Sequence, residues 1–180
     1  MPQAVTHVLI ALIIVSLIRD FYISKKDKQR FPLHYVLIAG IAGLLPDIDI
    51  IAYYGLSFFG FTIAEVHRTF THTLFLPILL LIIAGLTWKI KSKELGKHHL
   101  TFHMIFLMLA LGSIIHLFLD AFLSGRIMPI YPFSQYMINF SVVSYIPANL
   151  QSLFFPSLDA ILLVLWLVYM EYRHKISDFI

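Results

Sequence analysis

The chain has 180 residues, of which 59% are hydrophobic and 13% are charged, and its mean hydropathy is +0.86. Soluble domains carry about 25% charged residues, so this composition excludes an ordinary soluble protein and predicts one membrane-embedded domain over residues 1–180. The absence of cysteine excludes disulfides and thiolate zinc fingers. The net charge of +3 comes from basic residues gathered in short loops, a pattern typical of membrane topology and not of nucleic-acid binding.

Five apolar segments approach the length of about 20 residues that a membrane-spanning helix needs. In chain order they cover residues 4–23, 33–54, 73–90, 100–122 and 158–172. The second segment is the least regular, because Pro46 and two aspartates lie in its last third. The sequence therefore predicts an all-α fold, an integral membrane helical bundle of about five transmembrane helices.

Lysine and arginine are distributed between the loops in a way that predicts the orientation of the bundle. Five of them lie in or beside the loop after the first segment and four in or beside the loop after the third. The loops after the second and fourth segments hold only Arg68 and Arg126. Because basic loops stay in the cytoplasm, we predict a multi-pass protein of the cell (inner or plasma) membrane with its N-terminus outside and its C-terminus cytoplasmic. Residues 125–156, rich in Pro, Ser, Tyr and Phe, are predicted to form an irregular segment on the outer face.

Ionisable side chains in or beside a bilayer are energetically expensive and usually mark a functional site. Seven such residues lie at segment ends that the predicted orientation places outside: His7, Asp47, Asp49, His67, His72, His116 and Asp120. The orientation was derived from lysine and arginine alone, so the agreement of these seven residues is independent evidence for a shared pocket. We predict that they are the ligands of a metal centre, or its immediate support.

The spacing of these residues suits metal coordination. His116 and Asp120 are four residues apart and share a helix face about 6 Å from each other, and Asp47 and Asp49 repel each other unless a cation lies between them. Imidazole and carboxylate ligands suit zinc first, with manganese or iron as alternatives and with one or more ions. Taken alone, the two aspartates fit a solvated helix end equally well, and His116 with Asp120 fits a simple hydrogen-bonded pair.

Two further residues of the same outer loop are candidates for catalysis. Glu65 is a candidate general base or additional ligand. Arg68 is a candidate phosphate contact, although an interfacial anchor is an equally good interpretation of it. No site for an organic cofactor is predicted.

Several motifs of this chain, taken in order, resemble those of a known family. They are Thr6-His7, Leu45-Pro46-Asp47-Ile48-Asp49, His67-Arg68-x-x-Thr71-His72, His116-x-x-x-Asp120, Gly125 and Tyr131-Pro132-Phe133-Ser134. Together they resemble the YdjM-type family of membrane-bound metal-dependent hydrolases, from the N-terminus to about Ser134. The chain departs mildly from that pattern at Thr69-Phe70, where the family often has a glycine, and at Thr73, where a serine is frequent. The resemblance implies an integral membrane protein with a histidine–aspartate metal centre and hydrolase activity.

The residues and the resemblance together predict a metal-dependent membrane hydrolase. We expect metal-activated water to cleave a phosphoester at the outer face, and we expect the substrate to be a lipid or lipid-linked molecule from the bilayer, with no nucleic acid as partner. The alternative is a non-catalytic protein that binds or transports metal with the same cluster, or one in which the metal only stabilises the fold. The oligomeric state is left open.

Overall fold

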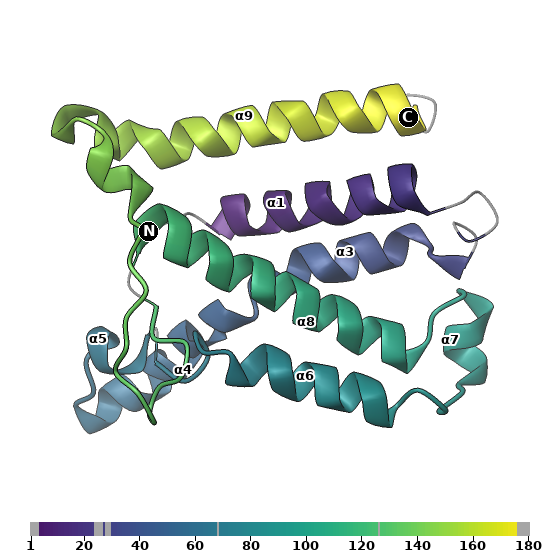
Figure 1. The fold of residues 1–180 in the computed structure, drawn as a ribbon, viewed down its shortest axis with the longest axis horizontal. Helices are drawn as coiled ribbons and strands as arrows, with labels where there is room; N and C mark the ends of the chain where they lie inside the picture. Colours follow the sequence, from purple (N-terminus) through teal and green to yellow (C-terminus); the bar gives the residue numbers. More distant parts are fainter. Residues whose placement is uncertain (1–3, 24–26, 28–29, 68, 126, 176–180) are drawn as a thin grey trace.

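The computed structural model describes residues 4–23, 27, 30–67, 69–125 and 127–175 (Figure 1). These residues are mainly helical and contain no strand beyond one isolated bridge, which confirms the all-α prediction. The long helices are α1 (Ala4–Leu17), α3 (Leu33–Ala42), α6 (Phe75–Leu86), α8 (Phe102–Leu119) and α9 (Ala148–His174). The short helices are α4 (Asp49–Leu56), α5 (Ile63–Val66) and α7 (Lys93–Lys97), with 3₁₀ turns at Pro46–Ile48, Ser57–Phe59 and Val142–Tyr145. Wider π-helical turns extend α1 through Ile18–Tyr22 and α8 through Asp120–Ser124.

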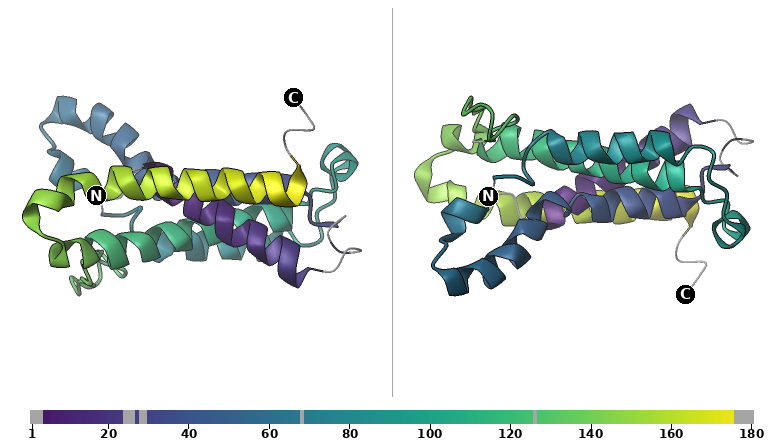
Figure 2. Two further views of the ribbon diagram at one scale, coloured as in Figure 1. Left: turned by 90° about the horizontal axis from the view of Figure 1, so that it is seen from above. Right: turned by 90° about the horizontal axis from the view of Figure 1, so that it is seen from below.

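The long helices form a bundle with α8 at its centre. Helix α8 packs against α1, α3 and α6, and α1 packs in addition against α3 and α9. Helices α6 and α9 therefore lie on opposite outer sides of the bundle (Figure 1). Helices α4 and α5 gather at one end of the bundle together with the segment before α9, whereas α7 lies at the other end (Figure 1; Figure 2).

Small residues let α3 approach its neighbours closely. A Cβ added to Gly112 of α8 would lie 2.4 Å from the carbonyl oxygen of Ala39 in α3, and one added to Gly43 would lie 2.7 Å from the carbonyl oxygen of His7 in α1. Such crossings are typical of membrane helices, whose association depends on close backbone contact. This packing holds the end of α3 against His7.

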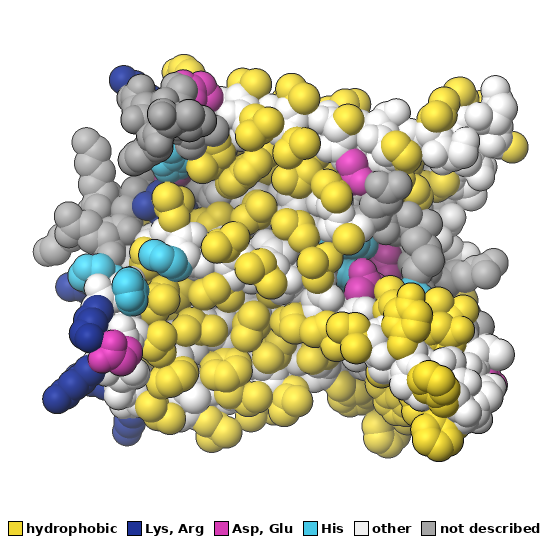
Figure 3. All heavy atoms as spheres, turned by 180° about the vertical axis from the view of Figure 1, so that it is seen from behind, with side chains coloured by type: hydrophobic (Ala, Val, Ile, Leu, Met, Phe, Trp, Pro, Cys, Tyr) yellow, Lys and Arg dark blue, Asp and Glu magenta, His cyan; other side chains and the backbone are white. Residues whose placement is uncertain are grey.

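The outside of the bundle is apolar. Large side chains such as Leu37, Ile82 and Val168 are more than half exposed, and hydrophobic side chains cover the middle of the face seen in Figure 3. On that face the basic side chains gather at the α7 end, beside histidine and acidic side chains, and a separate group of acidic and histidine side chains lies toward the opposite end. An apolar belt between two polar ends is the surface that a bilayer requires.

Three helical segments are long and apolar enough to cross a membrane: Ala4–Tyr22, Phe102–Ser124 and Ala148–His174. A fourth span results if Leu33–Ala42 and Pro46–Phe59, which meet at an angle of 47°, count as one broken span. The described residues thus support three to four spans where about five were predicted.

Helix α6 accounts for the missing span, because it is shorter than the segment predicted at residues 73–90. Its 12 residues extend about 18 Å, against a hydrocarbon core of about 30 Å. Threonines close both ends: the Thr73 hydroxyl accepts from the N–H of Phe75, and the Thr87 hydroxyl donates to the carbonyl of Ile83. Threonine side chains that bond to nearby backbone groups compete with helix continuation in this way.

The segment predicted at residues 33–54 is also broken, between α3 and α4. Proline cannot donate an N–H to the helix. The backbone bonds after Ala42 tighten to the i→i−3 pattern, and the chain enters a 3₁₀ turn at Pro46. This break bends the chain where the two aspartates lie.

Helix α9 begins earlier than predicted. It starts at Ala148, so the irregular segment predicted over residues 125–156 ends at Pro147. Pro147 suits a helix start because it lacks the N–H that would be unbonded there, and its carbonyl accepts from the N–H of Leu150 at 2.8 Å. The helix then continues through Pro156, which apolar membrane helices tolerate.

Candidate metal centre

The seven residues predicted to form a metal centre meet at the end of the bundle where α4 and α5 lie. They come from α1 (His7), the 3₁₀ turn before α4 (Asp47), α4 (Asp49), the chain after α5 (His67), the turn before α6 (His72), α8 (His116) and the turn that extends α8 (Asp120). The break at Pro46 returns the two aspartates toward α1 and α8, which is why segments far apart in sequence can share one site.

Four donor atoms form the centre of this cluster. The Nε2 atom of His72 lies 3.3 Å from Asp47 Oδ1 and 3.6 Å from Asp120 Oδ2. The Nε2 atom of His116 lies 3.7 Å from each of these oxygens, and the two imidazole nitrogens are 3.2 Å apart. Bonds of about 2.0–2.2 Å around a four-coordinate zinc ion place neighbouring ligands about 3.3–3.6 Å apart. The spacing therefore suits a divalent transition metal.

His7 and His67 flank these four residues. The His7 ring stacks on His116 with ring centres 3.9 Å apart, and its Nε2 lies 3.7 Å from Asp120 Oδ1. The His67 ring meets His72 edge-on at 4.9 Å. Among the described residues, three groups place their donor atoms within 4.8 Å of one another: His7, Asp47 and His116; Asp47, His67 and His72; and His72, His116 and Asp120.

Hydrogen bonds around the cluster fix how its imidazoles face. The Nδ1 atom of His116 lies 2.7 Å from the carbonyl oxygen of Gly43, which can only accept, so this nitrogen carries the proton. The Nε2 lone pair of His116 is then free to bind a metal. Metal-binding histidines are typically held by such a bond from the other ring nitrogen.

Asp49 supports two imidazoles at once. Its Oδ1 lies 2.9 Å from Nδ1 of His67, and its Oδ2 lies 3.2 Å from Nδ1 of His72. The Thr71 hydroxyl donates to the same Oδ2 at 2.9 Å. With Nδ1 engaged, both imidazoles offer Nε2 to the cluster, and Nε2 of His67 is buried without a hydrogen-bond partner. A metal ion could supply the partner that this nitrogen lacks.

The cluster is buried, and Asp47 is its most open member. The side chains of His72 and His116 are fully buried and that of Asp120 is 3% exposed, whereas the Asp47 side chain is 24% exposed. Two buried imidazole nitrogens 3.2 Å apart and two carboxylates beside them are unfavourable unless a cation or proton lies between them. The donor set therefore fits a metal, with access at Asp47.

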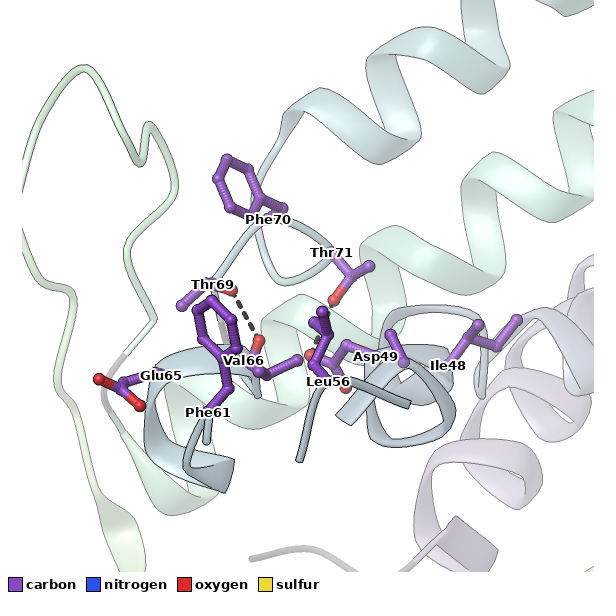
Figure 4. A pocket seen from close by; sticks show the side chains of 10 residues that line it. Ile48, Asp49, Leu56, Phe61, Glu65, Val66, Thr69, Phe70 and Thr71 are labelled. Carbon is purple, nitrogen blue, oxygen red and sulfur yellow. Dashed lines mark hydrogen bonds between the residues drawn. The ribbon is translucent and has the colours of Figure 1, made fainter. Parts of the chain in front are cut away.

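Glu65 lies apart from the cluster and caps α5. Its Oε2 accepts from the Thr62 backbone N–H at 2.7 Å and from the Thr62 hydroxyl at 2.8 Å. These bonds, that of the backbone first, hold the pKa of Glu65 below its usual value, and the carboxylate points away from Asp49 in Figure 4. The other predicted catalytic residue, Arg68, lies outside the described residues.

An apolar cavity of about 300 Å³ adjoins the cluster at Asp49. Asp49 and Thr71 contribute polar groups to its lining, and Figure 4 shows the Thr71 hydroxyl directed at Asp49. The rest of the lining is mainly apolar and includes Ile48, Leu56, Phe61, Val66 and Phe70. The cavity thus places an apolar surface beside the residue that orients two imidazoles.

One buried contact beside the site was not predicted from the sequence. Asp159 of α9 is 8% exposed and accepts a hydrogen bond from the Thr6 hydroxyl. This bond ties α9 to the turn of α1 that carries His7. The only signal in the sequence is an aspartate near the start of an apolar segment, where an entry charge is an equally good interpretation.

Fold and site together define a membrane-embedded helical bundle with a buried histidine–aspartate cluster at one end. Within that class the chain belongs to the YdjM inner membrane protein family, whose model matches residues 1–175. The match confirms the resemblance seen in the sequence and extends it past Ser134 over nearly the whole chain. No curated protein and no solved structure matches the chain.

Proposed function

We propose that this protein is an integral membrane hydrolase that uses a divalent metal, zinc first and manganese or iron as alternatives, to cleave a phosphoester. The observation that carries the proposal is the convergence of imidazole nitrogens and carboxylate oxygens at 3.2 to 3.7 Å. The hydrogen bonds that hold the outer nitrogens of these imidazoles add to it.

The residues around the centre of the cluster have two kinds of role in the proposal, holding the metal and orienting the imidazoles. When bound, the metal supplies a Lewis acid that lowers the pKa of water and polarises an ester oxygen. His72, His116 and Asp120 would provide donors on the buried side of the metal centre, and Asp47 would provide one where the site opens. Asp49 keeps two imidazoles in the orientation that exposes their lone pairs.

We propose a lipid or lipid-linked phosphoester as the substrate. The apolar cavity beside Asp49 has the character that an acyl or isoprenoid chain needs. Its rim includes Phe61 and Phe70, which are 48% and 66% exposed. Because the bundle lies in a bilayer, such a chain can reach the cavity without passing through water.

Arg68 is kept in the proposal as a phosphate contact, because an arginine matches the planar pair of oxygens on a phosphate. For Glu65 the bonds to Thr62 favour helix capping over a role as general base. The proposal therefore does not depend on Glu65.

We propose that the metal end of the bundle faces outward across the cell membrane. The lysines of α7 lie at the end of the bundle opposite to the cluster (Figure 1). Basic segments stay in the cytoplasm, so this separation supports an N-terminus outside and a multi-pass protein with its site on the outer face.

A turnover assay tests the hydrolase. The full chain, purified in lipid nanodiscs, is given zinc, manganese or iron and a panel of phosphoesters with and without lipid tails. We expect metal-dependent turnover that chelation abolishes. Asp120→Asn should insert normally and lose bound metal, while the exposed matched control Glu94→Gln should keep both metal and turnover. Full metal occupancy in Asp120→Asn would refute the assignment of the site.

A metal carrier built on the same cluster is the second hypothesis. Transport needs a polar path across the bundle, but each metal-ligating group that the described residues form lies at one end. The core toward the other end contains apolar side chains such as Val15, Val36 and Met108, which favours a one-sided site. Metal uptake into proteoliposomes without turnover on any phosphoester would replace the hydrolase with a carrier.

A further inference from the structure

The cluster offers more donors than one ion uses. Protein zinc sites bind four ligands, and catalytic ones bind three with an open position. Six residues of this cluster belong to groups of three whose donor atoms lie within 4.8 Å of one another: His7, Asp47, His67, His72, His116 and Asp120. One ion would leave some of these buried donors unused.

Only two of the three groups can hold a metal ion at the same time. The group of His72, His116 and Asp120 shares an imidazole with each of the other two groups. A neutral imidazole has one lone pair for a metal, and the other nitrogens of His72 and His116 are already engaged with Asp49 and Gly43. An imidazole therefore cannot serve two ions here.

The other two groups are His7, Asp47 and His116, and Asp47, His67 and His72. They have only Asp47 in common. A carboxylate has two oxygens and can bridge two cations. We infer that this site holds two divalent cations, one bound by His7 and His116, the other by His67 and His72, with the Asp47 carboxylate between them. The inference deepens the proposed function and rests on it only in taking the cluster as a metal centre.

Asp120 is placed as a second link between the two positions. Its Oδ1 lies 3.7 Å from Nε2 of His7, whereas its Oδ2 lies 3.6 Å from Nε2 of His72 and 3.7 Å from Nε2 of His116. The carboxylate thus faces imidazoles of both pairs from the buried side. Asp47 faces them from the open side.

His67 distinguishes two ions from one. The four central donors alone could surround a single ion. Nε2 of His67, whose side chain is only 9% exposed, would then stay buried without a partner. Leaving a buried polar group unpaired is unfavourable. A second ion held by Asp47, His67 and His72 would give this nitrogen a partner, because Asp49 already engages the other ring nitrogen of His67.

A pair of ions bridged at the open side defines the chemistry of the ligand. Two metals about 3.5–4 Å apart clamp the attacking and leaving oxygens of an in-line displacement. The ligand class that fits is an anionic phosphoester, whose oxygens can contact both cations. The more exposed Asp47 lies where such a group would arrive.

Metal content tests the inference without any turnover. The full chain, purified in nanodiscs and dialysed against buffered zinc, is analysed for metal and protein by mass spectrometry. We expect two ions per chain in the unmodified protein, one in His67→Gln and one in His7→Gln. The control His103→Gln removes an imidazole that bonds to Ala84 outside the cluster and should keep two. One ion per chain at saturation, or two in His67→Gln, would overturn the inference.

Manganese provides a second readout, which tests the unmodified protein by itself. In the unmodified protein loaded with Mn²⁺ we expect the electron paramagnetic resonance spectrum of an exchange-coupled pair, and in His67→Gln that of an isolated ion. An isolated-ion spectrum in the fully loaded unmodified protein contradicts the bridge, even if the variants fail to fold. Two bound ions without turnover would refute the hydrolase and leave this inference standing. Turnover with one ion per chain would refute this inference and leave the hydrolase standing.

Discussion

Asp49 is the residue that organises the cluster from outside it. Its two oxygens lie 2.9 and 3.2 Å from the Nδ1 atoms of His67 and His72, and it belongs to none of the groups of converging donor atoms. A carboxylate in this position fixes the tautomer of an imidazole and raises its basicity as a ligand. Asp49 therefore acts through two histidines at once.

Asp49→Asn should weaken metal binding without removing a ligand. The amide keeps one acceptor oxygen, so only one of the two imidazoles keeps its supporting bond. Loss of such support typically costs about 10- to 100-fold in metal affinity, and we expect that range in a competition titration with a zinc chelator. The control Thr71→Val removes only the hydroxyl that donates to Asp49 and should cost less. An unchanged affinity in Asp49→Asn would show that Asp49 does not orient the ligands.

Glu65→Gln tests whether this residue caps a helix or transfers a proton. Glutamine also completes a capping box with threonine, so a capping role predicts turnover close to that of the unmodified protein. Loss of a general base typically costs about 10²- to 10⁴-fold, and a loss of that size would make Glu65 the base. The cap also depends on pH: because the pKa of Glu65 is lowered, its contribution is present at neutral pH and is lost in acid as the carboxylate protonates. With glutamine this dependence should vanish.

At the scale of elements, the crossing of α3 and α8 determines where the aspartates stand. Gly112 of α8 touches Ala39 and Ala42 of α3, and the chain leaves α3 directly afterwards on its way to Asp47. On α8 itself His116 follows Gly112 by about one turn. The helix contact and the site are thus mechanically connected.

Gly112→Ala should destabilise the bundle and weaken metal binding together. The added Cβ would lie 2.4 Å from a backbone oxygen of α3, and overpacking of this kind costs about 1–3 kcal/mol. The matched control is Gly85→Ala in α6, where nothing lies within 4 Å of the added Cβ. Thermal unfolding of the metal-free protein, followed by a zinc titration, measures both effects. Equal stability of the two variants would contradict the close crossing.

Helix α9 is fastened to both ends of α1, taken together with the π-helical turn that extends it. Asp159 bonds to Thr6 beside the cluster. At the other end the buried Asp20 accepts from the Tyr169 hydroxyl at 2.6 Å and lies 3.0 Å from Nε2 of His174. Polar contacts buried between apolar helices fix their register. Helix α9 therefore fixes the position, along the bundle axis, of the turn that carries His7.

At the scale of the whole molecule, the two ends of the bundle differ in the polar side chains that they carry. The α7 end presents basic side chains and the other end holds the acid and imidazole cluster (Figure 3). An apolar belt lies between them. A bilayer that covers this belt therefore leaves the two ends in different compartments.

Labelling of single cysteines determines which end is outside. The chain has no cysteine of its own, so Ser57→Cys beside α4 and Lys93→Cys in α7 report on one end each, and both positions are exposed. We expect a membrane-impermeant maleimide to label intact cells at position 57 and to reach position 93 only after permeabilisation. The reverse pattern would place the metal site in the cytoplasm, and equal labelling of both positions in intact cells would contradict a spanning bundle.

The sequence alone determined the class of protein and predicted which polar residues lie together at one end of the bundle. Hydropathy and charge spacing predict a helical membrane bundle because burial in lipid depends on local composition. The seven predicted cluster residues were found for a related reason: ionisable groups are conspicuous in apolar segments. Their motifs also carried the resemblance to the family.

Tertiary structure decided where each of these residues lies relative to the converging imidazoles. Asp47 and Asp49 look equivalent in the sequence, yet one faces the converging imidazoles and the other supports two of them from behind. The contact between Thr6 and Asp159 likewise joins residues distant in sequence. The physical reason is that composition places a residue at a membrane depth, whereas the direction of a lone pair depends on how each helix is rotated and packed.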